Sequence, residues 1–348
     1  MKTKYIISTI ALTGVLALTG CEDFLEQKNT HDLNQQTFFD SEAALRAATA
    51  PLYNYVWAGF NDKFYYGMGD GRANNITAQY SDYIYPYTNL SETSLSQGLT
   101  DAWNSFYSVV AQANNTINNI TDYSAPTLSE DSKRASIAEA RFMRGTAYWY
   151  IASLWGVGII YTNTSSMVNN YVVPANPGLD VIEFAIRDLE YAAKYLPKTP
   201  ADAGRVTCYS AYGMLSRVYL SMAGLTTDGL YNGSNVATDF NRGTRNQTYL
   251  DLAKRAALKV IAESGAGLID NYGDLFAAKS FNNNSESLFQ LQWLPATQAN
   301  SSACGNTMVR FLAWSTMVAD KDAWGGATYC SWNLWEEFKT YKDETLGK

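Results

Sequence analysis

The sequence predicts a mainly α-helical protein built from paired helices. Three observations lead to this fold class: apolar stripes with helical spacing, small residues along those stripes, and helix-ending residues just beyond them. Apolar residues three and four positions apart line one side of a helix, and that side packs against a neighbouring element. Small side chains on such a stripe let two helices approach closely, so we expect antiparallel helix pairs.

Six stripes have this spacing. In chain order they cover 45–55, 103–120, 137–154, 182–196, 211–222 and 250–260. Because alanine recurs on the last four, we predict two hairpins of tetratricopeptide type, 131–156 with 178–196 and 207–223 with 248–264. Periodicity alone supports only an array of helical hairpins.

The ends of the stripes contain helix-ending signals. Pro197 follows the fourth stripe and should end that helix, and Gly224 and Gly265 stand where C-terminal caps are expected for the fifth and sixth. Thr248 and Asp251 have the spacing of an N-terminal capping box.

Several side chains on the predicted helices should have structural roles. Cys208 lies within an apolar helical pattern and is expected in the core. Arg141 and Arg144 should pair with acidic residues of the adjacent hairpin. The aromatic residues at 148–150 and Trp155 are expected to pack in the core rather than to bind a ligand.

Two regions, 58–100 and 266–335, interrupt the helical periodicity. Both are rich in glycine, asparagine and aromatic residues, and within the second the segment 287–293 alternates as a short strand would. They are predicted to be long ordered loops, and long loops in a compact domain commonly carry function.

The amino terminus has the pattern of a bacterial lipoprotein signal. Lys2 and Lys4 precede an apolar run at 5–18, and the tetrapeptide LTGC ends at Cys21. We predict a signal peptide at 1–20, lipidation of Cys21 with palmitate-type acyl chains, and a tether and strap at 21–40. The alternative is an ordinary secretory signal with a chance cysteine. The acidic pair at 22–23 is either a surface-export signal or part of a solvated linker.

Composition argues against several function classes. Removing Lys2 and Lys4 from 26 basic residues leaves 24 against 33 acidic ones, a formal charge of −9, which disfavours a nucleic-acid partner. His31 is the only histidine and lies in the tether, so no histidine-based metal site or Ser–His–Asp machinery is expected. We expect no metal or cofactor. Cys304 and Cys330 could pair after export, but nothing in their spacing requires a disulfide, and we expect none.

Several segments, in this order, resemble the SusD/RagB family of Bacteroidetes outer-membrane lipoproteins. EARFMRGTAYWYIASLWG at 139–156 resembles the signature helix of that family, and WNSFYSVVAQANNTINNI at 103–120 resembles an earlier helix. RVTCYSAYGMLSRVYLSMAG at 205–224 resembles a later helix with its Arg-x-Thr start. With the lipoprotein signal, the likeness covers nearly all of 15–293.

The resemblance implies a fold, a location and a function. It implies a SusD-like superhelix of tetratricopeptide-like hairpins over 41–265, followed by the start of a loop-rich, ligand-facing region at 266–348. Family members usually continue beyond the position of Lys348, so that region is expected to be incomplete. It further implies a lipid-anchored, surface-exposed protein of the outer membrane that captures glycan and delivers it to a SusC-like TonB-dependent transporter, without catalysis.

Three other functions are kept as alternatives. One is a purely structural helical-repeat adaptor that contacts only protein. The chain could be a peptide-import relative within the same family. It could also be a glycosidase acting through two carboxylates, for example Asp70 and Asp82, although no motif favours that pair.

Sugar binding requires flat rings for the apolar sugar faces and planar polar groups for the hydroxyls. The segment 65–87 interleaves both kinds, and a second mixture lies at 314–335. The predicted ligand-binding residues are Asp70, Arg72, Asn74, Tyr80, Tyr83, Tyr85, Trp314 and Trp324. Each tyrosine could instead pack on the scaffold, and Asp70, beside two glycines, could instead fix a turn. Trp332 and Trp335 have helical spacing and are expected in the core.

Overall fold

A computed structural model describes most of the chain. The described residues are 35–78, 84–164, 167–168, 172–226, 245–276, 282–293, 314, 316 and 328–340. The predictions for the signal peptide, Cys21, Tyr80, Tyr83, Trp324 and the Cys304–Cys330 pair therefore fall wholly or partly outside the described residues, as does the proposed Asp70–Asp82 pair. The chain forms two units, 1–38 and 39–348, and the described part of the first is helix α3 (Gln35–Phe38).

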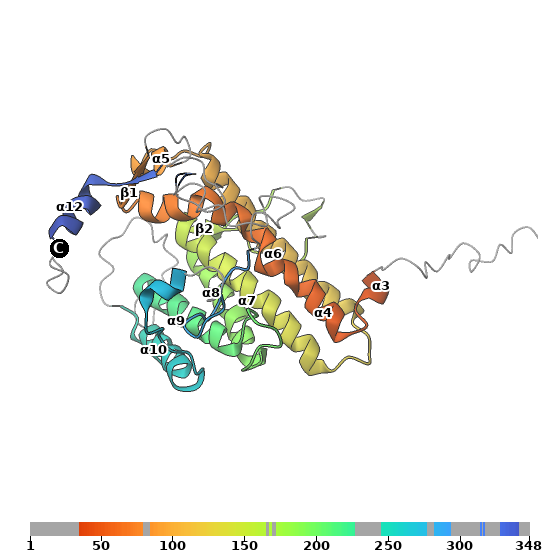
Figure 1. Ribbon diagram of the computed structural model, residues 1–348. Coiled ribbons are helices and arrows are strands. Elements are labelled where there is room, and N and C mark those ends of the chain that lie inside the picture. Colours follow the sequence, from red (N-terminus) through yellow and green to blue (C-terminus); the bar gives the residue numbers. More distant parts are fainter. Residues whose placement is uncertain are drawn as a thin grey trace, which may run out of the picture. The chain divides into compact units, whose positions relative to one another are not determined.

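The second unit is dominated by helices that follow one another along the chain (Figure 1). Its elements are α4 (Glu42–Thr49), η1 (Ala50–Tyr53), η2 (Tyr55–Trp57), η3 (Phe60–Phe64), η4 (Gly67–Gly71), β1 (Ile76–Ala78), α5 (Tyr85–Thr88), α6 (Gln97–Tyr123), α7 (Glu130–Trp155), β2 (Val157–Gly158), β3 (Asn176–Pro177), α8 (Gly178–Tyr195), α9 (Cys208–Leu225), α10 (Gln247–Glu263), η7 (Tyr272–Phe276), β4 (Thr328–Cys330) and α12 (Trp332–Thr340). From α6 to α10 each long helix packs on the next, which confirms the predicted fold class and both helix pairs.

The predicted apolar stripes form one continuous core. Phe106 of α6, Met143 of α7, Leu189 of α8 and Val218 of α9 are all buried in it. The predicted core position of Cys208 is also confirmed. Close approach of the helices depends on small residues: a Cβ added at Gly145 of α7 would lie only 2.9 Å from the Ala185 carbonyl oxygen of α8.

The helix ends agree with the sequence at some positions and differ at others. Pro197 and Gly265 do lie just beyond α8 and α10, and Gly265 is left-handed with φ +70°. Gly224 was wrongly predicted as a cap, because it lies inside α9. The predicted capping box at 248–251 is also wrong. Helix α10 begins at Gln247, and its N-cap is Asn246, whose side chain accepts a hydrogen bond from Tyr249 N.

Segment 287–293 does not form the predicted strand. Its backbone groups form separate hydrogen bonds and no ladder with a neighbouring strand. Gln292 N donates to Tyr53 O at 2.9 Å, and Ser287 N donates to Asn284 O. The ring of Phe289 packs edge-on against Tyr53 and Phe142, so the alternating apolar residues cover the helices instead of a sheet.

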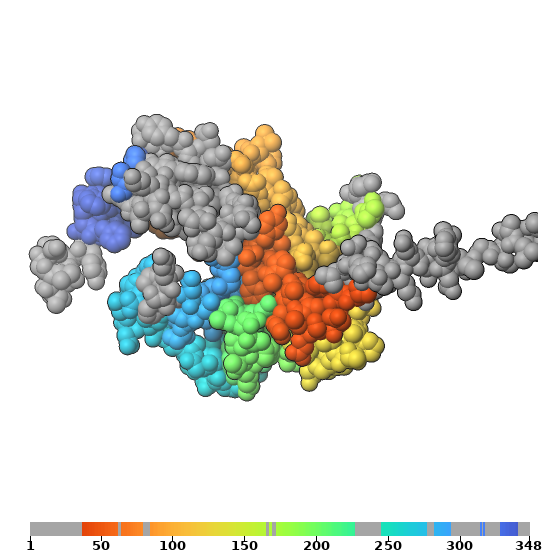
Figure 2. All heavy atoms as spheres, turned by 45° about the vertical axis from the view of Figure 1, so that its right-hand side comes forward, coloured from red at the N-terminus to blue at the C-terminus, as the bar shows by residue number. Residues whose placement is uncertain are grey.

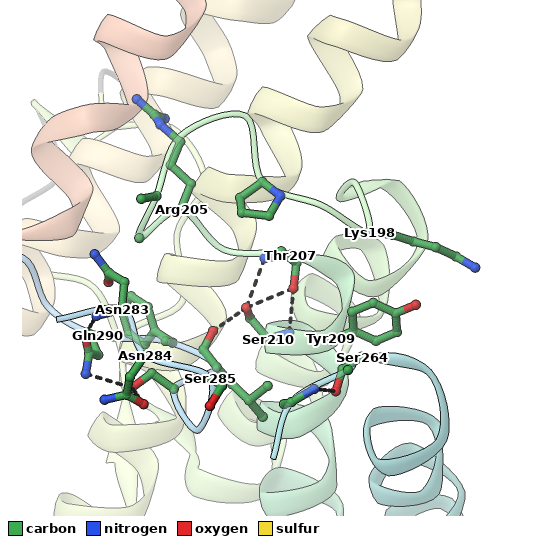
Figure 3. Close-up of a pocket in the computed structure, with 18 residues that line it drawn as sticks. Lys198, Arg205, Thr207, Tyr209, Ser210, Ser264, Asn283, Asn284, Ser285 and Gln290 are labelled. Carbon is green, nitrogen blue, oxygen red and sulfur yellow. Dashed lines mark hydrogen bonds between the residues drawn. The ribbon is translucent and has the colours of Figure 1, made fainter. Parts of the chain in front are cut away.

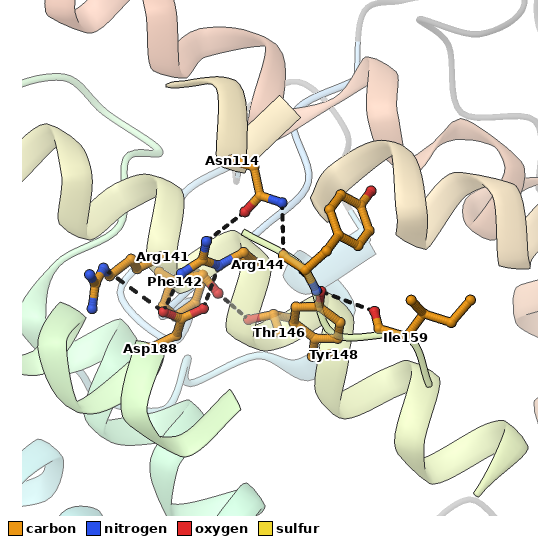
Figure 4. Close-up of polar contacts among 9 residues, drawn as sticks. Asn114, Arg141, Phe142, Arg144, Thr146, Tyr148, Ile159 and Asp188 are labelled. Carbon is orange, nitrogen blue, oxygen red and sulfur yellow. Dashed lines mark hydrogen bonds and ion pairs between the residues drawn. The ribbon is translucent and has the colours of Figure 1, made fainter. Parts of the chain in front are cut away.

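A buried ion pair joins α7 to α8 (Figure 4). Arg144 donates to both oxygens of Asp188, from Nε at 2.7 Å and from Nη2 at 2.8 Å. Its Nη1 donates to Asn114 Oδ1 of α6 at 2.5 Å, and Asn114 Nδ2 donates to Tyr161 O at 3.0 Å. Arg141 Nε lies 3.9 Å from Asp188 Oδ1. Both arginines therefore face an acidic residue, but it lies on α8 of the same hairpin and not on the adjacent hairpin as predicted.

This network is buried and almost fully paired. Arg144 is 4% exposed and Asp188 2% exposed. Burial raises the pKa of Asp188, while the hydrogen bonds and charge of Arg144 act to lower it. Paired buried charges of this kind hold helices in one arrangement, since breaking the pair leaves an uncompensated charge in the interior.

A second polar cluster ties the start of α9 to α4 and α7. Arg205 Nη1 donates to Glu139 Oε2 at 2.8 Å and to Thr49 Oγ1 at 2.6 Å, and its Nη2 donates to Arg46 O. Two residues later Thr207 caps α9, in a capping box with Ser210. The two named residues of the Arg-x-Thr motif therefore have different structural roles. Arg205 joins the start of α9 to α4 and α7, and Thr207 caps the N-terminus of α9.

Candidate functional site

The described part of the predicted binding segment, 65–87, folds into short elements that pack around the buried side chain of Tyr87. Cβ atoms added at Gly67 and Gly71 would lie 2.8 Å and 3.3 Å from atoms of Tyr87, and one at Gly98 would lie 2.5 Å from its hydroxyl. Only glycine permits so close an approach at Gly67 and Gly98. Tyr87 is fully buried and Tyr66 nearly so, and burial raises the pKa of Tyr87. These two tyrosines therefore pack on the scaffold.

Other tyrosines of the same segment face solvent. Tyr65 is 50% exposed and Tyr85 of α5 is 53% exposed. Tyr65 packs edge-on against the ring of Phe60, with ring centroids 5.5 Å apart. Of the predicted binding tyrosines, Tyr85 is the one within the described residues, and it is available to a ligand.

Asp70 lies in η4, and Arg72 and Asn74 lie in the turn that joins η4 to β1. Asp70 Oδ1 accepts a hydrogen bond from Asn75 Nδ2 at 3.1 Å, and Asn75 N donates to Asp70 O at 2.9 Å. Asp70 therefore does fix the turn, in which Asn74 has a left-handed φ of +60°. All three predicted side chains are nonetheless exposed.

Arg72 is held in place by a glutamate. Its Nη1 forms a hydrogen-bonded ion pair with Glu92 Oε1. The Glu92 side chain is 8% exposed and that of Arg72 is 43% exposed. The buried carboxylate thus fixes one edge of the guanidinium while part of the group stays at the surface, an arrangement suited to donating hydrogen bonds to a ligand.

The turn is joined to a segment more than 250 positions later in the chain. Strand β1 pairs antiparallel with β4, with Thr77 opposite Tyr329 and Ile76 opposite Cys330. Ser331 reinforces the contact, because its N donates to Asn75 O at 3.0 Å and its Oγ donates to Asn74 O at 2.5 Å. The two predicted ligand-facing regions therefore meet at this sheet.

Helix α12 follows β4 directly and displays aromatic side chains. Trp332 is 69% exposed, Trp335 51% and Phe338 64%. The prediction that the two tryptophans lie in the core was wrong, because helical spacing places residues on one face without determining what covers that face. The atoms of α12 (violet-blue) are visible on the surface in Figure 2. The predicted residue Trp314 is exposed as well, by 51%.

We call η4, β1, α5, β4 and α12, with the turn at 72–75, the aromatic unit. It carries the exposed residues Asp70, Arg72, Asn74, Tyr85, Tyr329, Trp332 and Trp335. Tyr329 was missed by the sequence analysis, since a strand of three residues leaves no clear pattern. Its neighbourhood could have been suspected only from the aromatic density of 314–335.

A separate hollow of about 380 Å³ lies between the start of α9 and the loop at 283–290 (Figure 3). Many of its polar groups already form hydrogen bonds with other groups of the protein. Ser210 Oγ donates to Leu288 O, Asn283 N donates to Gln290 Oε1 at 2.8 Å, and Gln292 Nε2 donates to Asn283 Oδ1 at 2.9 Å. The first bond holds the loop against α9, and the other two join residues within 283–292, so all three have a structural role.

Gly204, at the edge of this hollow, should not tolerate a side chain. Its φ is +88°, and an added Cβ would lie 2.8 Å from Gln292 Nε2. We expect Gly204→Ala to lower the free energy of unfolding by about 1–2 kcal/mol, measured by urea denaturation. Gly267→Ala is a matched control, because nothing lies within 4 Å of a Cβ there and φ is not positive. Equal stability of the two variants would contradict the left-handed conformation of Gly204 and its close contact with Gln292.

Among the described residues, no group of three or more histidine, cysteine, aspartate or glutamate side chains could hold a metal ion. In the same part of the chain, no helix combines the length and apolar character required to cross a bilayer.

Comparison with known proteins decides the family. A SusD-like family model, described as "Starch-binding associating with outer membrane", matches residues 23–220, more than half of the chain. The chain belongs to the SusD-like family. The resemblance seen in the helices at 103–120, 139–156 and 205–224 is thereby confirmed. The family is one of carbohydrate-binding proteins associated with the outer membrane.

Individual SusD-like proteins show how much of the fold is shared. A SusD-like protein of Bacteroides ovatus is 38% identical over 319 residues, covering 91% of this chain and 54% of its own. A crystal structure with xylogluco-oligosaccharide is 36% identical with a TM-score of 0.73, covering 85% of this chain and 55% of its own. A SusD-like carbohydrate-binding protein of Bacteroides fragilis, 20% identical with a TM-score of 0.62, shares the fold over 86% of this chain and 53% of its own. The chain spans about half the length of the curated relatives it matches.

Proposed function

We propose that this SusD-like chain captures neutral oligosaccharides through its aromatic unit. The observation that carries the proposal is the set of exposed rings and polar groups which the β1–β4 pairing gathers: Trp332 and Trp335 on one side, and Arg72 with Asn74 on the other. The related structure with xylogluco-oligosaccharide, at 36% identity, supports that oligosaccharide as the first ligand to test.

The chemistry of the aromatic unit suits sugars. Indole and phenol rings offer flat apolar faces to the C–H faces of a pyranose, and their exposure leaves those faces accessible. The guanidinium of Arg72 donates hydrogen bonds, and the side-chain amide of Asn74 both donates and accepts. Neutral sugars carry no charge to steer binding, so ring contacts should supply most of the affinity.

The proposal also covers the location of the protein and its transport partner. Lipid on Cys21 would hold it at the outer membrane, and its role there would be to pass oligosaccharide to a SusC-like TonB-dependent transporter. The lipoprotein pattern at 1–21 and the description of the family as associating with the outer membrane support this. We propose that the chain binds its ligand without cleaving it.

Isothermal titration calorimetry of the full chain with xylogluco-oligosaccharide tests the proposal. Trp332→Ala and Trp335→Ala should each weaken binding by about tenfold or more, through loss of ring contact worth about 1.4 kcal/mol. Phe276→Ala is the control, because that ring is 71% exposed but lies in η7, outside the aromatic unit. Unchanged affinity in both tryptophan variants would refute the assignment, and cleaved product would refute binding without turnover.

A further inference from the structure

A groove between α8 and α10, crossing α9, is separate from the aromatic unit. It consists of two adjoining cavities, each of about 590 Å³, which share Glu190, Tyr219 and Leu252. Figure 1 shows the three helices side by side. No residue of the aromatic unit lines either cavity.

The two cavities differ in charge. The first is lined by Glu183 and Arg187, which form an ion pair with each other at 2.7 Å. The second, which we call the cationic cavity, is lined by Lys194 of α8 and by Arg255 and Lys259 of α10. Its remaining walls are the rings of Tyr212 and Tyr219 and an apolar surface, formed by Ala193, Leu215, Leu252 and Ala256.

Positive charge predominates in the cationic cavity. Its one carboxylate, Glu190, accepts a hydrogen bond from Tyr219 Oη at 2.6 Å where the two cavities meet. Lys259 Nζ forms an ion pair with Glu263 Oε1 at 2.6 Å, and Glu263 does not line the cavity. Within the described residues, neither Arg255 nor Lys194 forms an ion pair, and Lys194 Nζ lies 4.9 Å from the centroid of the Tyr195 ring. Two cations facing the cavity thus lack an anionic partner among those residues.

We infer that the cationic cavity binds a ring bearing a carboxylate, the chemistry of a uronic-acid sugar. Its volume lies within the range of about 300–1,000 Å³ typical of small-ligand sites. The guanidinium of Arg255 can grip a carboxylate with two parallel hydrogen bonds, and an ammonium can add a third. The tyrosine rings and the apolar wall can contact the sugar ring of the ligand. A free inorganic anion would leave that part of the cavity unfilled.

A matched pair of probes tests this inference on the full chain. We expect 4-methylumbelliferyl glucuronide to bind at least about tenfold more tightly than 4-methylumbelliferyl glucoside, which has a hydroxymethyl group in place of the carboxylate. Arg255→Ala and Lys259→Ala should each weaken glucuronide binding by about tenfold in calorimetry, and added salt should weaken it further. Lys254→Ala is the control, because it removes an exposed cation of α10 that does not line the cavity.

The outcome separates this site from the aromatic unit. Trp332→Ala should leave glucuronide affinity unchanged, whatever its effect on neutral oligosaccharides. Equal affinity for the two probes, no binding of the glucuronide, or full binding by Arg255→Ala would each overturn the inference. Loss of glucuronide binding in Trp332→Ala would overturn it too, by placing that ligand on the aromatic unit.

Discussion

Replacing Arg144 by methionine should lower the free energy of unfolding by about 3–5 kcal/mol. Methionine keeps much of the apolar volume but removes all three hydrogen bonds that Arg144 donates to Asp188 and Asn114. Asp188 would then remain 2% exposed with Arg141 Nε, 3.9 Å away, as its nearest cation. Urea denaturation followed by circular dichroism measures the loss.

The matched control is Arg187→Met, on the same pair of helices. Arg187 pairs with Glu183 at 2.7 Å, but the two side chains are 69% and 47% exposed. An exposed pair of this kind contributes about 0–1 kcal/mol, so this variant should be nearly as stable as the parent. Similar losses in both variants would contradict the structural role of the buried pair.

The Arg144→Met loss should also depend on pH. Burial already raises the pKa of Asp188, and removing Arg144 takes away the interactions that oppose this shift. A carboxyl group with a raised pKa in the folded state binds protons more readily than the unfolded chain does, so it favours folding as the pH falls. The gap between variant and parent should therefore be smaller at pH 5 than at pH 7.

Replacing Gly145 by valine should cost about 3 kcal/mol. A Cβ at this position would lie 2.9 Å from Ala185 O, 3.0 Å from Leu189 Cγ and 3.2 Å from Asp188 Cβ, all on α8. Backbone oxygen cannot move aside as a side-chain tip can, so α7 and α8 would have to separate. The same denaturation measurement applies.

Gly224→Val provides the comparison. Gly224 lies within α9, and nothing lies within 4 Å of an added Cβ. Helix propensity slightly favours valine over glycine, so stability should change by no more than about 0.5 kcal/mol. If Gly145→Val were equally mild, the close α7–α8 contact would be wrong.

The helical scaffold could be predicted because its signals are local and repeated. The stripes at 137–154 and 182–196 placed α7 and α8 correctly. An acidic partner was expected for Arg144, but on the adjacent hairpin, whereas Asp188 supplies it from the paired helix α8. Helix ends were less predictable, since Asn246 and Thr248 are both capable caps. Only the packed structure selects Asn246.

The candidate site was only partly predictable, because it depends on contacts between distant segments. Sequence composition identified Asp70, Arg72, Asn74 and Tyr85 as polar and aromatic neighbours. It did not identify the pairing of β1 with β4 or the hydrogen bond from Ser331 to Asn74, which involve single residues and three-residue strands. Exposure of Trp332 and Trp335 likewise depends on what packs around α12, which helical spacing does not encode.

Hydrogen–deuterium exchange of the full chain, with and without saturating xylogluco-oligosaccharide, tests most directly whether the aromatic unit is the binding site. Backbone amides of 67–78 and 328–340 should exchange more slowly when the oligosaccharide is bound, while those of α9 and α10 should be unchanged. Protection confined to α8–α10, or binding without any protection at 67–78 and 328–340, would contradict this assignment.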